Sequence, residues 1–516
     1  MRLEQIDILH FQGIKALSLP LDQATTLIGE NAWGRRSFLN ALDRVMGPQG
    51  VEAVFEEADF YQGTDQLQLS LTFVERQGGH WRRLRYRPLR QLMWGQSDGH
   101  MRIRLCWQAR LGQGSRLFFA DAKGQPLEAE QCQRLARHLL ALHPLLRLGF
   151  PEPEHLAKTP WLKTLLDAPE QFKEQALEEG LASVKAVLAR YFSEEAPKVP
   201  RSRFAIARQP VNWQAIRTLE QVITQSSRQT RMALLGLFGV MMVQEGDKPL
   251  ARLARPLLLL DMPEARLHPV MLATFWSLVS QLPLGRLLLT QSAELLGAQD
   301  LMAIRRLVRR QGELRCFRLK QLLREDDYRR IGFHLRVNRP SSLFARCWLL
   351  VEGETEIWLM SELAHLAGVH LAAEGIKVID FAQCGLKPLL HLARDLGIGV
   401  HVLCDGDEAG DRYADKVRGT LGNQAEASLT QLPALDIEHF FFEEGYGALF
   451  RHLAHWHGHG EPSSIIRTAI SRLSKPEVAL RIAEEAGKRG KEGVPVLLRR
   501  LFSQLRQAAL ASAPKG

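Results

Sequence analysis

The chain of 516 residues is long enough for two or three domains, each with its own hydrophobic core. Its formal net charge of +10 favours a polyanionic partner, although excess charge also serves solubility. The six cysteines form no Cys-x-x-Cys pair, and the sequence shows neither a secretory leader nor an apolar run of membrane-spanning length. These features exclude a disulfide scaffold, a zinc finger and a transmembrane protein, and they predict a cytoplasmic protein.

Residues 2–20 alternate apolar and polar side chains around a Gln-Gly pair, a pattern that predicts a β-hairpin. The next stretch, residues 25–42, reads as a strand, a glycine-containing loop and an amphipathic helix. Its Gly29-x4-Gly34 spacing is typical of a phosphate-binding loop, in which backbone N–H groups and the helix N-terminus receive phosphate oxygens. The residues that such a loop would present to a nucleotide are Gly29, Asn31, Gly34, Arg35, Arg36 and Ser37.

The loop departs from the usual pattern at the residues that carry its chemistry. Arg35 replaces the expected lysine, and its planar guanidinium is not equivalent to a compact ammonium. Arg36 replaces the hydroxyl residue that would bind Mg²⁺, and Ser37 comes one position too late. We therefore predict a loop that binds nucleotide but hydrolyses it poorly. The alternative is an ordinary glycine turn between a strand and a helix.

Residues 66–110 carry the alternation of β-strands, and the run from His80 to Arg90 would place arginines on one face of a strand. Such a face fits a nucleic-acid backbone and a charge-protected edge strand equally well. Residues 126–195 are predicted to be helical throughout from their apolar spacing. Residues 195–202 have the composition of a linker.

Two apolar runs farther along predict buried strands: residues 256–261, which end in Asp261, and residues 286–292, which contain Gln291. Residues 300–342 are strongly basic. Arg305 to Arg310 fit a solvated helix face, whereas the whole stretch fits a joint that guides DNA toward an active site. We favour the second interpretation because phosphodiester chemistry needs a docked polyanion.

Two acidic stretches organise the C-terminal part of the chain. Residues 348–351 are apolar and lead to Glu352 and a glycine, after which a helical pattern begins. Residues 398–403 are also apolar and lead to Asp405 and Asp407. Parallel strands gather their carboxyl ends at one edge of a sheet, where open α/β sheets bind ligands. Clustered carboxylates repel one another unless a cation such as Mg²⁺ or Mn²⁺ lies between them, so we predict a divalent-cation site.

A strand-end Glu-Gly followed later by Asp-x-Asp resembles the pattern of a Toprim domain. In order with the N-terminal motifs, the chain is similar to the overcoming-lysogenisation-defect (OLD) family of ATP-dependent nucleases, most closely its YbjD-like branch, on residues 339–355 and 374–379. The resemblance implies an α/β fold with an N-terminal ABC/SMC-like ATPase domain over residues 1–335 and a C-terminal Toprim domain, a Rossmann-like parallel sheet, over residues 343–516. It also implies a helical insertion at about residues 126–200, which would be a dimerisation arm.

For the ATPase domain, the resemblance places Asp261 in the Walker B position and Gln291 where the family usually has a histidine. It places the signature loop at residues 225–231, with Arg228 in place of a glycine, and Met262 where a water-orienting acid is expected. Because these departures accumulate, we predict that ATP binds but is hydrolysed weakly or not at all.

For the Toprim domain, the resemblance implies DNA cleavage with two Mg²⁺ or Mn²⁺ ions. Glu352, Asp405 and Asp407 would hold the first ion, and Glu356 and Glu438 the second. Lys475 would offset charge on the scissile phosphate. The predicted partners are DNA, a second copy of the chain and an operon partner protein, with no membrane.

Two other classes of function stay open. One is a non-catalytic sensor or scaffold, in which nucleotide binding controls the binding of DNA or a partner. The other is topoisomerase or primase chemistry, which Toprim domains also support. A topoisomerase requires a tyrosine nucleophile in a DNA-binding setting, and none of the six tyrosines has one, so we rank this class last.

Overall fold

The computed structural model describes residues 1–148 and 255–512, apart from short gaps. The gaps are residues 31–32, 48–49, 129, 266–271, 273–275, 277–278, 281–284, 311–312, 321–323 and 338. The chain divides into two compact units, the first made of residues 1–27 and 34–295 and the second of residues 28–33 and 296–516. In the part of the chain that the structure describes, no helix combines the length and apolar character needed to cross a membrane.

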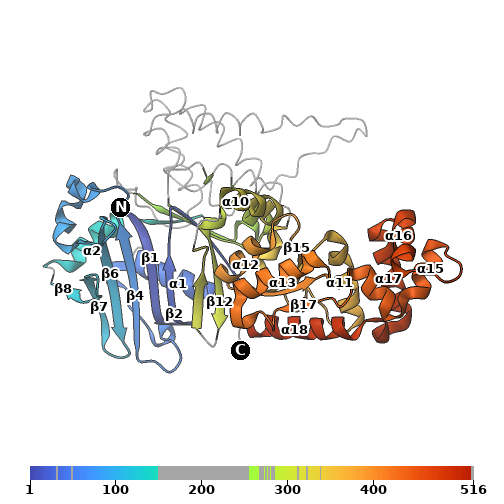
Figure 1. Cartoon of the computed structure of the whole chain (residues 1–516). Helices are drawn as coiled ribbons and strands as arrows, with labels where there is room; N and C mark the ends of the chain where they lie inside the picture. Colours follow the sequence, from blue (N-terminus) through green and yellow to red (C-terminus); the bar gives the residue numbers. More distant parts are fainter. Residues whose placement is uncertain are drawn as a thin grey trace, which may run out of the picture. The chain divides into compact units, whose positions relative to one another are not determined.

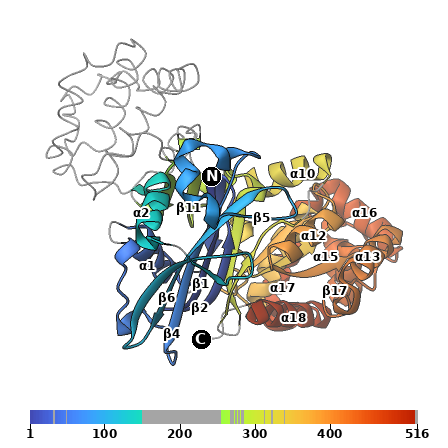
Figure 2. The same cartoon turned by 90° about the vertical axis from the view of Figure 1, so that its left-hand side faces the viewer.

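The first unit contains an antiparallel sheet with the strand order β2-β1-β4-β6-β7-β8, to which β5 adds beside β6 (Figure 1). The predicted hairpin is confirmed, because the first two strands pair antiparallel across the Gln-Gly turn. Figure 2 shows these strands from the side, with helix α1 beside them. The strands are β1 Arg2–Phe11, β2 Ile14–Pro20, β4 Gln66–Val74, β5 Trp94–Gly95, β6 Met101–Arg110, β7 Gly114–Ala120 and β8 Pro126–Leu127.

A second sheet has the order β13-β12-β3-β11-β10-β9. Its strands are β3 Ala24–Gly29, β9 Leu145–Leu148, β10 Leu257–Asp261, β11 Gly285–Leu289, β12 Ile304–Arg310 and β13 Glu313–Phe317. Strand β11 pairs in parallel with both β3 and β10, so the carboxyl ends of these three strands lie at one edge. The predicted strand, loop and helix at residues 25–42 are confirmed by β3 and by helix α1, Arg35–Met46.

The second unit is built on a parallel sheet with the order β15-β14-β16-β17. The strands are β14 Cys347–Val351, β15 Ile376–Asp380, β16 Gly399–Cys404 and β17 Leu429–Gln431. All five residues of β14 are buried, which explains why its sequence is an unbroken apolar run rather than an alternating one. The predicted parallel α/β sheet is therefore confirmed.

Helices connect and cover these strands, and α15, α16 and α17 gather at one end of the second unit (Figure 1). Among the described residues the first unit also contains helix α2 Cys132–Leu142, and helix α9 Ala293–Gly297 spans the division between the two units. In the second unit the helices are α10 Glu325–Ile331, α11 Glu354–Leu366, α12 Leu386–Asp395, α13 Glu408–Leu421, α14 Ile437–Phe441, α15 Gly447–Ala454, α16 Pro462–Leu473, α17 Lys475–Arg489 and α18 Val496–Ser512.

The arginine-rich run at residues 80–90 is not the strand that we predicted. It forms two 3₁₀ helices, His80–Arg82 and Leu84–Leu92. Tyr86, Leu89 and Leu92 are its buried residues, and their spacing of three matches the three residues per turn of a 3₁₀ helix. The apolar residues thus outweighed the apparent alternation of arginines.

Two helical predictions were also wrong. Leu145 lies in strand β9, so residues 126–195 are not helical throughout, and residues 149–195 lie outside the described residues, as does the signature loop at 225–231. Arg305 to Arg310 belong to strand β12 rather than to a solvated helix. Because Arg305 and Arg306 are 1% and 2% exposed, they are not available to guide DNA.

Arg306 instead joins three segments of the second unit. Its guanidinium donates hydrogen bonds to the carbonyl oxygens of Leu396 and Gly397 after helix α12, and to that of Ala345 before strand β14. Burial lowers the pKa of this guanidinium to about 10. The basic residue that sequence analysis assigned to DNA is therefore part of the internal framework.

Candidate functional site

The two predicted acidic stretches meet at the carboxyl edge of the parallel sheet. Strands β14 and β16 are neighbours in register, with Leu350 opposite Val402, so both chains leave the sheet at the same level. The backbone N–H of Asp405 donates a hydrogen bond to Glu352 Oε1 at 3.1 Å. Glu352 and Asp405, 53 residues apart in sequence, thus share one site.

Glu356 joins this site from the first turn of helix α11. Its Oε2 accepts a hydrogen bond from the backbone N–H of Gly353 at 3.0 Å. A Cβ atom at position 353 would lie 3.0 Å from the same oxygen. A glycine after Glu352 therefore lets the Glu356 carboxylate fold back toward the strand end.

Gly406 brings the Asp405–Asp407 turn against the segment after β17. A Cβ at this position would lie 2.4 Å from the carbonyl oxygen of Ala434, which a real side chain cannot tolerate. Asp407 then caps helix α13, where its Oδ1 accepts a hydrogen bond from the backbone N–H of Gly410 at 2.7 Å. The middle glycine of Asp-Gly-Asp is required by this close approach.

Glu438 and Lys475 form an ion pair next to these acids. Lys475 Nζ, at the start of helix α17, lies 3.5 Å from Glu438 Oε1 on helix α14. Glu438 is 2% exposed, and among the described residues its Oε2 has no hydrogen-bond partner. A buried carboxylate oxygen without a partner is costly and indicates room for a ligand.

The carboxyl groups influence one another electrostatically. Burial, followed by repulsion from Glu352, Glu356, Asp436 and Glu438, raises the pKa of Asp405 from 3.8 to about 8. Burial also raises the pKa of Glu352 and of Glu438, and nearby carboxylates add to both shifts. Burial would lower the pKa of Lys475, but attraction by Glu438 and Asp436 outweighs it and raises that pKa. The site thus holds more negative charge than it can accommodate without a cation.

An ion pair lies at the end of the glycine-containing loop for which we predicted phosphate binding. Arg35 donates two hydrogen bonds to Asp261, from Nε to Oδ1 at 2.8 Å and from Nη2 to Oδ2 at 3.0 Å. The hydrogen bond to Asp261 raises the pKa of the Arg35 guanidinium. Arg35, in the position of the expected lysine, and Asp261, in the predicted Walker B position, therefore neutralise each other's charge.

The other loop residues are also engaged or exposed. Gly34 has a φ angle of 97°, which a residue with a side chain adopts at a cost. A Cβ on Gly29 would lie 2.7 Å from the Trp33 indole, so this buried indole fills the space beside the loop. Ser37 Oγ accepts a hydrogen bond from the backbone N–H of Gly13 at 3.1 Å. Arg36 is exposed, and Asn31 lies outside the described residues.

At the neighbouring strand ends, Glu264 holds the position next to Gln291. Its Oε1 accepts hydrogen bonds from Thr290 Oγ1 at 2.9 Å and from the backbone N–H of Gln291 at 2.6 Å. The side chain of Met262 cannot activate water. One oxygen of Glu264 is thus bonded within the protein, whereas among the described residues its buried Oε2 has no hydrogen-bond partner.

Comparisons with known proteins identify the family of the chain. A family model described as "Protein of unknown function (DUF2813)" matches residues 1–342, and one described as "Overcoming lysogenization defect protein-like, TOPRIM domain" matches residues 343–407. The Escherichia coli (strain K12) "Uncharacterized protein YbjD" is 40% identical over 98% of both chains. The chain belongs to the OLD family. Within the OLD family it lies in the branch of YbjD, and its second unit contains the OLD-like Toprim domain.

Solved structures are similar to separate parts of this OLD-family chain. The C-terminal region of the Xanthomonas campestris pv. campestris OLD protein is 16% identical, with a TM-score of 0.28, over 32% of this chain and 94% of that one. The C-terminal region of the Burkholderia pseudomallei OLD protein is 19% identical, with a TM-score of 0.27, over 32% and 99%. The SMC head domain from Thermotoga maritima is 11% identical, with a TM-score of 0.33, over 62% and 100%.

The Toprim residues of this OLD-family protein have the chemistry for a hard divalent cation. All the candidate ligands are carboxylate oxygens, which Mg²⁺ and Mn²⁺ prefer as ligands. Among the described residues, the buried Oε2 of Glu438 has no hydrogen-bond partner. Within the described residues, however, no three His, Cys, Asp or Glu side chains already stand close enough to hold a metal ion. The carboxylate side chains therefore suit a divalent cation in chemical type and charge. To bind one, they would have to move closer to one another.

Sequence analysis did not select two residues beside this OLD-family site. Asp436 Oδ1 accepts a hydrogen bond from the backbone N–H of His439 at 2.8 Å and contacts His439 Nδ1 at 2.6 Å. His439 Nε2 lies 3.0 Å from Ser463 Oγ at the start of helix α16. This series of contacts from Asp436 through His439 to Ser463 holds helix α14, which carries Glu438, in place. The available signal was an aspartate directly before a short helix, a typical N-cap.

The raised pKa of Asp405 predicts a pH-dependent stability of the cation-free protein. Between about pH 4 and pH 8 the folded state retains a proton that the unfolded chain releases, so the free energy of unfolding falls as pH rises. We expect Asp405→Asn to reduce this fall and to raise the melting temperature at pH 8 by about 3 °C. Melting curves in EDTA at pH 5 and pH 8 test this, and equal slopes for both proteins would contradict it.

Proposed function

We propose that this OLD-family protein is a divalent-cation-dependent endonuclease that cleaves or nicks DNA phosphodiester bonds. The matched Toprim domain supports a nuclease-type function. The observation that carries the proposal is the convergence of Glu352 and Asp405. Burial and the neighbouring carboxylates raise the pKa values of Asp405, Glu352 and Glu438. Such a set is expensive to maintain unless it binds cations.

In this proposal the chain's own acids are divided between two cation positions. Glu352, Asp405 and Asp407 would hold the first cation, and Glu356 and Glu438 the second. When bound, the cations supply Lewis acidity toward the attacking water and the leaving oxygen. Asp407 would leave its N-cap bond to Gly410 to take part.

Lys475 would act on the substrate rather than on the cations. Its ammonium is half-exposed and lies beside Glu438, so it can meet a phosphate oxygen while staying close to the acids. The surrounding carboxylates raise its pKa, which keeps the side chain charged at neutral pH. A charged lysine here would offset the developing negative charge on the scissile phosphate.

We also propose that the first unit binds ATP weakly and hydrolyses it weakly or not at all. The bidentate pair of Arg35 with Asp261 supports this, because a nucleotide phosphate would have to separate two groups that already neutralise each other. The Trp33 indole beside Gly29 adds to the same conclusion. Nicking would then not depend on ATP hydrolysis.

A non-catalytic sensor or scaffold that acts with DNA or a partner is the second candidate. It is favoured by one observation, that no metal-ready group of three ligands exists among the described residues. The homodimer, the operon partner, the cytoplasmic location and the domain boundaries at residues 335 and 343 stay predictions. The helical arm falls on residues outside the described part of the chain.

The decisive experiment incubates the purified chain with supercoiled and linear DNA in Mg²⁺, Mn²⁺ or EDTA, with and without ATP. We expect nicking in at least one cation, none in EDTA, and a change of less than about twofold on adding ATP, because the nucleotide loop is internally neutralised. ATP hydrolysis should stay at background. A protein that binds ATP and DNA but cuts nothing would support the scaffold instead.

A further inference from the structure

The segment between strands β4 and β6 has an unusual charge composition. From position 76 to position 97 it contains six arginines and one histidine, and no aspartate or glutamate. The arginines are Arg76, Arg82, Arg83, Arg85, Arg87 and Arg90. So much charge of one sign in one short segment repels itself unless an anion neutralises it.

The two 3₁₀ helices orient this segment so that its charges face solvent. Tyr86, Leu89 and Leu92 are buried against the first unit, whereas Arg82, Arg83 and Arg87 are exposed. Leu84 lies between them and is 82% exposed. The apolar side of the segment is thus used for anchoring, and the arginine side is left at the surface.

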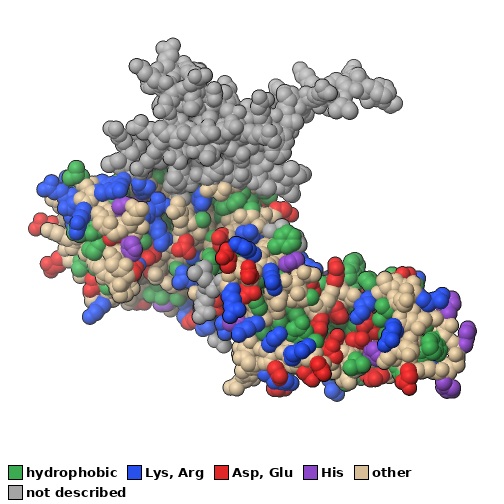
Figure 3. Space-filling model, turned by 45° about the horizontal axis from the view of Figure 1, so that its top comes forward, with side chains coloured by type: hydrophobic (Ala, Val, Ile, Leu, Met, Phe, Trp, Pro, Cys, Tyr) green, Lys and Arg blue, Asp and Glu red, His purple; other side chains and the backbone are tan. Residues whose placement is uncertain are grey.

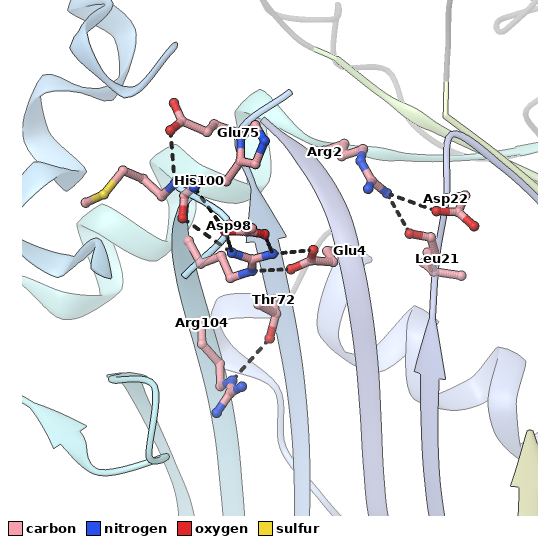
Figure 4. Close-up of polar contacts among 11 residues, drawn as sticks. Arg2, Glu4, Leu21, Asp22, Thr72, Glu75, Asp98, His100 and Arg104 are labelled. Carbon is pink, nitrogen blue, oxygen red and sulfur yellow. Dashed lines mark hydrogen bonds and ion pairs between the residues drawn. The ribbon is translucent and has the colours of Figure 1, made fainter. Parts of the chain in front are cut away.

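Three acids at the base of the segment bond to other groups instead of neutralising its arginines. Glu75 is 2% exposed, and its carboxylate accepts hydrogen bonds from the backbone N–H groups of Trp81 at 3.2 Å and Met101 at 2.9 Å. Glu4 and Asp98 each make a bidentate ion pair with the buried Arg102 (Figure 4). These three acids are engaged in bonds of their own, so they hold the segment in place without pairing with it.

One exposed arginine, Arg82, and one half-buried arginine, Arg90, flank an aromatic ring, and Arg90 also donates hydrogen bonds to the backbone carbonyl oxygens of Trp81 and Arg82. The guanidinium carbons of Arg82 and Arg90 lie 5.5 Å and 5.7 Å from the centroid of the Trp81 ring. Within the described residues, Arg82, Arg83, Arg87 and Arg90 form no ion pair with an acid. Figure 3 shows basic side chains gathered at the upper left of the described surface, on the first unit.

We propose that the exposed Arg82, Arg83 and Arg87, together with Arg90 beside Trp81, form an arginine platform that binds the phosphate backbone of DNA. The guanidinium carbons of Arg82 and Arg90 both lie within 5.7 Å of the Trp81 centroid, so these two groups are no more than about 11 Å apart. Phosphate charges follow one another closely along a DNA strand, so a cluster of guanidinium groups of this size can contact more than one of them. A single small anion would use only part of the cluster.

The chemistry of the platform favours sequence-independent binding. Arginine pairs with phosphate through two parallel hydrogen bonds, and such contacts position DNA without reading its bases. The inference rests on the proposed nuclease function for the choice of DNA as the polyanion. It adds a binding surface on the first unit, separate from the residues proposed to cut.

The test compares two triple variants with equal loss of charge. The platform variant carries Arg82→Gln, Arg83→Gln and Arg87→Gln. The control carries Arg116→Gln, Arg134→Gln and Arg137→Gln, which are exposed arginines on strand β7 and helix α2 of the same unit. Both change the net charge of +10 by −3, to +7.

Binding is measured in EDTA, where cleavage cannot occur, by the fluorescence anisotropy of labelled 30-base-pair duplexes of two unrelated sequences. At 100 mM salt we expect the platform variant to bind about tenfold or more weakly than the wild type. The slope of log K against log salt should fall by about 2 to 3, since each lost phosphate contact contributes about 0.9. The control should stay within about twofold of the wild type.

Equal losses in both variants, or no loss in either, would overturn the platform, provided that both keep the wild-type melting temperature. No DNA binding by the wild type at low salt would also overturn it and would leave an acidic protein surface as the partner. A wild type that binds through the platform but never nicks DNA would refute the proposed nuclease and leave the platform standing. The two proposals therefore fail separately.

Discussion

Replacing Asp405 by asparagine is expected to abolish cation-dependent nicking of supercoiled DNA, with a fall in rate of about 10³-fold or more. Asp405 is the acid that the others surround, because four neighbouring acids contribute to its raised pKa. Asparagine keeps the shape of the side chain but removes the charge that would hold a cation. The measurement is the rate of conversion of supercoiled to open-circular plasmid in Mg²⁺ and in Mn²⁺.

A matched substitution distinguishes loss of the proposed cation site from the general effect of removing one negative charge. Asp415 lies on helix α13, is exposed and pairs only at the surface with Arg418 at 3.2 Å. Asp415→Asn removes the same charge from the same unit, and we expect nicking within about twofold of the wild type. If Asp405→Asn kept more than a tenth of the wild-type rate, the carboxylate cluster could not be the cutting site.

The acidic site was largely predictable from sequence because its geometry follows from local rules. Two apolar runs that each end in an acid predict buried parallel strands, and parallel strands bring their ends to one edge. The structure places Glu352 and Asp405 in hydrogen-bond contact, as this reasoning expects. Glu438 and Lys475 needed the family resemblance, since nothing in their own sequence distinguishes them from surface residues.

Basic segments were predicted less well, because arginine patterns alone do not fix secondary structure. The segment at residues 80–90 follows its three buried apolar residues, and strand β12 is buried despite two adjacent arginines. Local propensity could not show that Arg306 would find three carbonyl acceptors, because one lies 39 residues away and the others about 90 residues away. Whether such an arginine is buried or exposed depends on hydrogen-bond partners that are distant in the sequence.

The nucleotide loop illustrates the same limit. Sequence comparison with the usual motif showed which residues had changed, and from this we predicted poor hydrolysis. It could not show that Arg35 and Asp261, 226 residues apart, would form a bidentate pair. The pairing gives a physical reason for one of the changes, the arginine at position 35, because an arginine fork matches a carboxylate as a lysine does not.

Arg306→Met is expected to lower the free energy of unfolding by about 3 to 5 kcal/mol without changing the DNA affinity of the folded protein. Methionine retains much of the apolar stem but donates no hydrogen bond. The carbonyl oxygens of Ala345, Leu396 and Gly397 would then lose the donor that joins strand β12 to the loops on either side. Urea unfolding followed by circular dichroism measures the loss.

The control for this change is Arg315→Met on strand β13, where the arginine is exposed and lies 3.9 Å from Glu313. Removing a surface charge of this kind should alter the free energy of unfolding by less than about 0.5 kcal/mol. If instead Arg306→Met kept full stability and weakened DNA binding, the buried guanidinium would have to reach solvent, and the basic stretch would guide DNA after all. The structure argues against that outcome, because a group with three internal acceptors and 2% exposure has nothing left to offer a phosphate.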